Sequence, residues 1–464
     1  MHRVERVLDV RQGQLCWVAG TVYLDMPLKP NILDDISRDV SVASFKRREC
    51  TLIHCATQLW IAAPPPREKY LSIDGQDKVM LEDESGRLQL TGIALQSELL
   101  VTGCIIAVMG TENANGDFEV IDIKLPEMPQ QLERWESETK NVTGETMAMP
   151  ESKSGSKVAI ISGLDINGEL GNSLVLDLFM EWILGESSSP SMQTNAAQIS
   201  RLIIAGNSLA EASPLSHDDH LPSAGASSKR AAVAKKYGYD SSAFNPAPTA
   251  QLDLFLSTIL PSIPITLIPG PSDPANVSLP QQPLHPALFP QSRVYTAAPP
   301  NKTPAESTIA GKSGSAHRSL SEQESSSFHS TTNPTLFTVA GHLFLGNGGQ
   351  PISDIAKYVD KVSTLDLMEH TLRWRLVAPT APDTLWCYPY QDDDPFVLAD
   401  GECPHVYFVG NQKEFGTSIV EGIQGQRVRC VSVPRFSERG EVVIVDLETL
   451  GVEIVKFEVF DGAG

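Results

Sequence analysis

Four short polar loops each come directly after an apolar run, and they hold the side chains best placed to do chemistry. They are residues 162–165, 206–210, 270–273 and 410–413. In open α/β sheets, ligands bind at the carboxyl ends of the strands, so loops in this position would converge on one site. The chemistry expected of such a site is metal-assisted hydrolysis, in which two cations about 4 Å apart hold a phosphate ester and activate water.

The order of these loops resembles the layout of the calcineurin-like phosphoesterases, whose patterns are Asp-x-His, Gly-Asp-x-x-Asp, Gly-Asn-His-Asp and Gly-His-x-His. Aligned motif on motif, the former metal-loop positions are Gly163, Asp165, Asn207, Pro271, Ser272, Asp273, Asn411 and Lys413. Two cations need several carboxylates and neutral imidazoles, whereas only Asp165 and Asp273 keep a carboxylate and Lys413 adds a positive charge. The sequence therefore predicts a degenerate site with no metal, no cofactor and no catalytic residue.

The third loop opens a proline-rich stretch, residues 267–290. Prolines on both sides of Gly270 each fix φ near about −65° and remove a backbone N–H, while glycine permits a turn closed to other residues. Asp commonly accepts hydrogen bonds from nearby backbone N–H groups. We therefore predict a rigid loop in which Asp273 caps the turn instead of binding an ion.

The segments around these loops indicate an α/β domain. Uniformly apolar runs are typical of strands covered on both faces, and they occur at residues 158–162, 202–205 and 265–268. Helices are predicted between them at residues 173–184 and 251–260. Further strands are expected at residues 336–345, 405–409, 427–433 and 442–446.

The N-terminal part of the chain has a different pattern, with several short strands and hairpin turns but few helices. We predict an OB-type (oligonucleotide/oligosaccharide-binding) barrel in residues 1–137. Polar residues 138–157 are expected to be a linker, and residues 158–464 a second domain. Within that domain, residues 297–334 are rich in Ser, Thr, Pro and Ala, which predicts a disordered insertion.

Composition limits the classes of function. The formal net charge of −21 argues against a broad grip on a nucleic-acid backbone. Residues 229–236 hold a small basic cluster, interpreted as a solvated loop, with a nuclear-import signal or contact with an acidic partner as the alternatives. The longest apolar stretch is too short to span a bilayer and the start lacks a secretion signal, so the seven cysteines are expected to be free thiols.

Longer motifs resemble the second (B) subunits of eukaryotic DNA polymerase delta. They lie, in the family's order, at residues 26–33, 79–83, 100–103, 267–290, 377–385, 387–389, 403–411 and 415–416. The resemblance implies an α/β protein with an all-β domain, namely an OB-type barrel packed on a calcineurin-like phosphoesterase-type β-sandwich flanked by helices.

The same resemblance implies a non-catalytic, nuclear scaffold in DNA replication and repair synthesis. Such a subunit would link the catalytic subunit of polymerase delta, through that subunit's cysteine-rich C-terminal region, to the third subunit. DNA would be contacted at most indirectly, and no membrane partner is implied.

The chain departs from that family in three places. It starts almost at the barrel, whereas members usually begin with a helical segment, which favours a truncated or misassigned N-terminus. Residues 40–63 form an atypical insert, and most of residues 297–334 is an insertion.

Two other classes of function stay open. An active metal-dependent phosphoesterase or nuclease requires that other residues rebuild the site. A single-strand-binding protein would use the barrel, but the acidic composition and the lack of an aromatic-plus-basic stripe count against it. Cys50, His54 and Cys55 lie in the atypical insert without a second ligand pair, and His285 and His405 are predicted to be structural.

Overall fold

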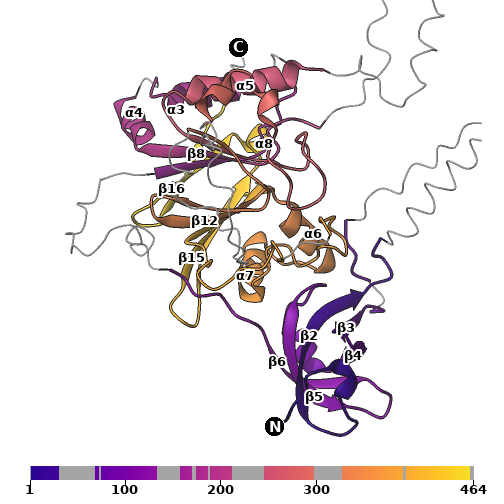
Figure 1. The fold of residues 1–464 in the computed structure, drawn as a ribbon. Helices are drawn as coiled ribbons and strands as arrows, with labels where there is room; N and C mark the ends of the chain where they lie inside the picture. Colours follow the sequence, from indigo (N-terminus) through magenta and orange to yellow (C-terminus); the bar gives the residue numbers. More distant parts are fainter. Residues whose placement is uncertain are drawn as a thin grey trace, which may run out of the picture. The chain divides into compact units, whose positions relative to one another are not determined.

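The computed structural model describes residues 2–30, 68–72, 75–132, 157–169, 174–186, 189–211, 245–296, 327–389 and 393–459. The chain forms two compact units (Figure 1). Unit 1 comprises Met1–Gln130, Pro351–Gly401 and Gly422–Gly425; unit 2 comprises Gln131–Gln350, Glu402–Glu421 and Gln426–Gly464.

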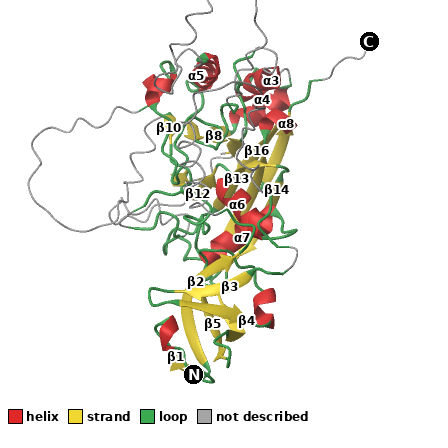
Figure 2. Ribbon diagram, turned by 90° about the vertical axis from the view of Figure 1, so that its right-hand side faces the viewer, coloured by secondary structure: helices red, strands yellow, loops and turns green. Residues whose placement is uncertain are grey.

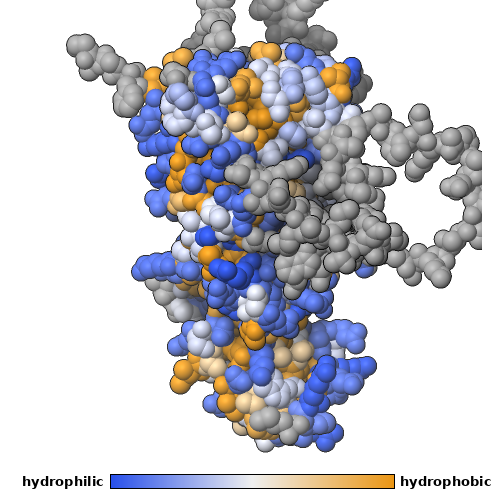
Figure 3. All heavy atoms as spheres, turned by 90° about the vertical axis from the view of Figure 1, so that its left-hand side faces the viewer, coloured by the Kyte–Doolittle hydropathy of each residue, from blue (hydrophilic) through white to orange (hydrophobic). Residues whose placement is uncertain are grey.

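Within the described ranges, no helix has the length and apolar character needed to cross a membrane. The face drawn in Figure 3 is largely hydrophilic, with hydrophobic side chains in places.

Unit 1 contains a closed barrel. Its strands are β2 (Cys16–Asp25), β3 (Lys78–Glu82), β4 (Arg87–Thr91), β5 (Ile105–Glu112) and β6 (Phe118–Lys124), with β1 (His2–Arg3) beside β2. The order is β2-β3-β4-β6-β5, and a further pairing between β2 and β5 closes the barrel. Alternate residues point inward, as the two-residue period of a strand requires, and the buried ones include Val18, Val22, Leu81, Leu90, Ile106, Val108 and Phe118. The small barrel predicted from the sequence is therefore present.

A segment far along the chain, residues 351–401, also belongs to unit 1. Lys29 Nζ, in the loop after β2, lies 2.7 Å from Asp383 Oδ2 of this segment. Arg375 Nε donates a hydrogen bond to the backbone oxygen of Glu127 at 2.8 Å. These two contacts fasten the segment to both ends of the barrel sequence.

The segment carries α6 (Gln350–Tyr358) and α7 (Thr364–Trp374). Helix α7 begins after Ser363, whose Oγ accepts a hydrogen bond from the N–H of Asp366. It ends where Arg375 adopts a left-handed conformation with φ of 55°. Neither helix was predicted from the sequence, and residues 351–401 were expected in the second domain. The structure places them with the barrel because the contacts that hold them are non-local.

Unit 2 has two sheets. The first has the order β10-β9-β8-β7-β16-β17 and the second the order β11-β12-β13-β15-β14. The first sheet consists of β7 (Lys157–Ile161), β8 (Ile199–Ala205), β9 (Ile265–Ile268), β10 (Phe328–Ser330), β16 (Glu441–Asp446) and β17 (Val452–Lys456). The second consists of β11 (Thr335–Val339), β12 (His342–Asn347), β13 (Val406–Gln412), β14 (Gly416–Glu421) and β15 (Arg427–Pro434).

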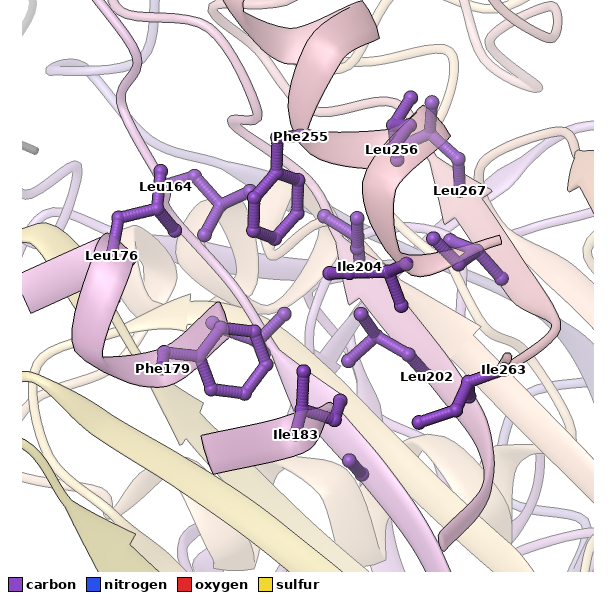
Figure 4. Packing of buried hydrophobic residues seen from close by; sticks show 14 of the residues in the cluster. Leu164, Leu176, Phe179, Ile183, Leu202, Ile204, Phe255, Leu256, Ile263 and Leu267 are labelled. Carbon is purple, nitrogen blue, oxygen red and sulfur yellow. The ribbon is translucent and has the colours of Figure 1, made fainter. Parts of the chain in front are cut away.

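The central strands of the first sheet, β7, β8, β9 and β16, are largely buried on both faces, as the apolar runs predicted. Along β7, Ile160 faces the second sheet and Ile161 faces the helices. Those helices are α3 (Leu174–Ile183), α4 (Pro190–Ala197) and α5 (Ala247–Ile259), which Figure 2 shows together at one end of unit 2, with the short α8 (Phe436–Arg439). Phe179 and Phe255 pack between α3, α5 and the sheet (Figure 4). Each fully buried side chain of this size contributes roughly 1.5–3 kcal/mol to stability.

Two predictions for unit 2 are wrong in detail. Residues 336–345 form most of the hairpin β11–β12 and not one strand, because the chain turns at Ala340 and Gly341, both with positive φ. The predicted disordered insertion extends too far, since β10 pairs with β9 and Asn333 is fully buried. Residues 297–326, most of the predicted linker and the 40–63 insert lie outside the described residues.

Candidate functional site

The four predicted loops meet at the carboxyl ends of parallel strands β7, β8, β9 and β13. The N–H of Gly163 donates to the backbone oxygen of Gly206 at 2.9 Å. The N–H of Gly206 donates in turn to Ile268 O at 3.0 Å, and the N–H of Asn411 donates to Ser162 Oγ at 2.8 Å. The loops therefore converge as the sequence predicted, and several of the hydrogen bonds that join them run from the backbone of one loop to the backbone of another.

Left-handed backbone is concentrated at this junction. Asp165, Asn207 and Asn411 have φ of 47°, 53° and 55°, values that residues other than glycine rarely adopt. Such conformations persist only where the surrounding structure fixes them, and they cluster at functional or formerly functional sites. Three of the predicted positions thus share a left-handed backbone, while Lys413 is exposed and makes no described contact with the other loops.

A fifth loop, which the sequence analysis missed, joins the junction after β12. Asn411 Nδ2 donates to Gly348 O at 2.8 Å, and the N–H of Gly348 donates to Asn333 Oδ1 at 2.9 Å. The same pattern as in the other four loops is present in the sequence here, because an apolar run, in β12, leads into Asn347, Gly348 and Gly349.

Neutral amides fill the space beside these loops. Asn333 Nδ2 donates to Gln281 Oε1 at 2.8 Å and to Gln350 Oε1 at 2.9 Å, and Gln350 Nε2 donates to Gln281 Oε1 at 2.9 Å. Asn207, only 3% exposed, accepts from the N–H of Ser272 at 3.2 Å. These groups satisfy one another, so they need no cation to compensate their burial.

Asp273 is the one buried carboxylate among the predicted positions, and it caps its own loop. Its Oδ2 accepts from the N–H of Gly270 at 2.7 Å and its Oδ1 accepts from the N–H of Leu209 at 2.9 Å. The capping role predicted for Asp273 is confirmed. Burial raises the pKa of this carboxyl from 3.8 to about 6, against the opposing effect of the backbone N–H bonds.

The raised pKa predicts a pH-dependent stability. Because the folded protein binds this proton more tightly than the unfolded chain, the contribution is fully present below about pH 3.8 and is lost as the pH rises through about 6. Relative to Asp273→Asn, the wild-type protein should gain about 1.4 kcal/mol of unfolding free energy between pH 7.5 and pH 5. Urea unfolding of both proteins at several pH values measures this difference; a difference that does not change with pH would contradict the prediction.

The donor set of the junction does not suit metal-assisted hydrolysis. Among the described residues, no group of three or more His, Cys, Asp and Glu side chains could hold a metal ion. Asp273 is engaged by backbone N–H groups, and Asp165 Oδ2 accepts from Ser437 Oγ at 2.6 Å. What remains is a packed junction of backbone and amides.

The two singled-out histidines make structural contacts. His285 Nδ1 accepts from the N–H of Ala287 at 3.1 Å. His405 Nδ1 accepts from the N–H of Leu343 at 3.0 Å, and its Nε2 lies 3.1 Å from Leu132 O. Both agree with the structural role predicted. Cys50, His54, Cys55 and the basic cluster at 229–236 lie outside the described residues.

Comparison with known proteins gives two family matches and close relatives along the whole chain. Residues 158–417 match the family model of the DNA polymerase alpha/epsilon B subunits, and residues 1–123 match the DNA polymerase delta subunit OB-fold domain. The DNA polymerase delta small subunit of Arabidopsis thaliana is 34% identical over 97% of this chain and 84% of that protein. The proteins of the same name from Oryza sativa subsp. japonica and Saccharomyces cerevisiae are each 33% identical over 98% of this chain, covering 86% and 82% of their own lengths.

Proposed function

Since the chain belongs to the family of DNA polymerase delta small subunits, we propose that it links the catalytic subunit of that polymerase to the third subunit. It is an accessory subunit and not the catalytic one. In this proposal the catalytic subunit is held through its cysteine-rich C-terminal region, and assembly takes place in the nucleus during replication and repair synthesis.

One observation carries the scaffold role. At the place where an α/β enzyme of this layout would hold its ligands, loop backbones and neutral amides bond to one another. The buried carboxylate there, Asp273, accepts two backbone hydrogen bonds of 2.7 and 2.9 Å. A junction closed in this way ties five loops together, and the described residues offer no set of ligands for the two cations that hydrolysis of a phosphate ester would require.

We further propose that unit 2 descends from a calcineurin-like phosphoesterase sandwich. In that descent, Gly163, Asp165, Asn207, Pro271, Ser272, Asp273, Asn411 and Lys413 occupy the former metal-loop positions. The proposal is supported by the strands that precede them, β7, β8, β9 and β13, and by the left-handed backbone at three of them. Strain of this kind is expected at a site that once held ligands in fixed directions.

Copurification tests the assembly. With the full chain tagged and coexpressed with the other subunits, we expect the catalytic and third subunits to elute with it at moderate salt. Removal of the cysteine-rich C-terminal region from the catalytic subunit should release that subunit and leave the third one bound. Retention of the truncated catalytic subunit would disprove the proposed attachment, and loss of both subunits from the intact set would disprove the scaffold role.

A further inference from the structure

A cavity of about 300 Å³ lies in unit 2 beside the first polar loop, and Asp165 of that loop lines it. Its wall includes Leu164 and Leu176, which lie next to each other at the edge of the helical core (Figure 4). Its acceptor groups come from Asp165, Glu169 and Gln251, and no lysine or arginine of the described chain lines it. The cavity is therefore lined by apolar side chains together with two carboxylates.

Within the described part of the chain, no cation pairs with the two carboxylates of this cavity. Asp165 accepts a hydrogen bond from Ser437, and no ion pair joins Asp165 or Glu169 to a described cation. The arginines at either end of α8 pair elsewhere, with Glu438 and Glu414. Gln251 Oε1 is buried without a hydrogen-bond partner, a condition that is costly unless a donor is supplied.

Hydrophobic side chains are exposed at this cavity and on the two helices, α3 and α5, that contribute to its lining. Leu174 and Val459, which both line it, are 59% and 44% exposed. Leu178 and Leu254, on α3 and α5, are 40% and 57% exposed. Figure 3 shows hydrophobic side chains among hydrophilic ones at the end of unit 2 that carries these helices. Exposed apolar side chains gathered beside polar groups are typical of surfaces that bind another polypeptide.

We propose that this cavity binds an arginine side chain presented by an apolar segment of a partner polypeptide. A guanidinium offers five N–H donors in one plane, so it can bond to a carboxylate and an amide oxygen together. Rotation about the terminal torsion of Gln251, which is broad for this residue type, would turn the unpaired oxygen toward that donor. The aliphatic part of the arginine would lie against Leu174 and Val459, and neighbouring apolar residues would cover the exposed leucines.

That the partner is another polymerase subunit rests on the proposed function, whereas the preference for a guanidinium does not. The test therefore uses the full chain alone and two synthetic peptides, acetyl-Leu-Arg-Leu-amide and the same peptide with citrulline, the neutral analogue of arginine, in place of arginine. Isothermal titration or ligand-observed NMR measures the dissociation constant of each peptide. We expect the arginine peptide to bind at one site, and about tenfold more tightly than the citrulline peptide, because its hydrogen bonds are charge-assisted.

Variants locate the site. Asp165→Asn, which the left-handed backbone tolerates, and Glu169→Gln on the exposed rim should each weaken binding of the arginine peptide by several-fold, about threefold to tenfold. Glu181→Gln removes the same charge from the exposed side of α3 outside the cavity and should leave binding unchanged.

Equal affinity for both peptides, absence of binding, or an equal loss in Glu181→Gln would overturn the proposal. Because no other subunit is present in this measurement, its failure would leave the copurification result unaffected. Loss of copurification would likewise leave the peptide result intact.

Discussion

Replacing Gly103 with alanine is expected to lower the unfolding free energy of unit 1 by about 3–5 kcal/mol, the range of severe single substitutions. Gly103 has φ of +93°, and a Cβ added there would lie 1.7 Å from the backbone oxygen of Pro379. A backbone atom cannot move aside as the end of a side chain can, so residues 376–385 would have to leave the barrel. The cost therefore combines backbone strain with the loss of packing between the barrel and this segment.

A second glycine of the barrel supplies the matched control. Gly116, in the turn between β5 and β6, has φ of +87° but no heavy atom within 4 Å of an added Cβ. Gly116→Ala should therefore cost only the conformational term, about 1–2 kcal/mol. Urea unfolding with hydrogen exchange measured peptide by peptide compares the two variants, and early exchange of residues 376–385 is expected only for Gly103→Ala. Equal losses in both variants would show that the approach to Pro379 contributes nothing.

The motif that contains Gly103 shows why part of the fold was predictable and part was not. The strand patterns of residues 79–83 and 100–109 follow from local alternation, so the barrel could be predicted from the sequence. Its union with residues 351–401 depends on the 2.7 Å contact between Lys29 and Asp383 and on the close approach at Gly103. Contacts between residues some hundreds of positions apart leave no local pattern, so this grouping of residues 351–401 with the barrel could not be predicted from the sequence.

The candidate site divides in the same way. The positions of Gly163, Asn207 and Asn411 follow from apolar runs that end in polar loops. The hydrogen bond from Gly270 to Asp273 is a local interaction within one turn, whereas the bond from Leu209 joins two loops and has no local pattern. The amide cluster could not be predicted, because Asn333 follows a Ser- and Thr-rich tract whose average composition indicates disorder. Its role appears only when β10 pairs with β9 and brings Asn333 beside Gln281. The average composition of residues 297–334 indicates disorder, and it conceals the few residues at the end of this range that pack against the rest of unit 2.

The strongest prediction for unit 2 concerns Gly270, in the proline-rich loop. The sequence suggested that glycine is needed there for an unusual backbone angle, but Gly270 is not among the glycines with positive φ. The reason is proximity, because an added Cβ would lie 2.3 Å from the backbone nitrogen of Asn207 and 2.4 Å from its Oδ1. Gly270→Val should therefore separate the second and third loops and destabilise unit 2 by about 3–5 kcal/mol.

The control and the chemical test for this loop follow from the same contacts. In Gly451→Ala, the added Cβ meets only the side-chain oxygen of Thr449 at 3.0 Å, so thermal melts of this variant should differ little from those of the wild-type protein.

A Pro271→Asn/Ser272→His double variant restores two residues of the phosphoesterase pattern, yet we expect no Mn²⁺-dependent phosphodiester hydrolysis. Ser272 Oγ donates to Leu209 O at 2.6 Å, so the replacement also loses a contact that holds the second and third loops together. The other loops still present Gly163, Asn207 and Asn411, which lack the charge and the imidazoles that two cations require. A melting temperature of the wild-type protein that rises with Mn²⁺ and does not rise in Asp273→Ala would show instead that this loop binds an ion.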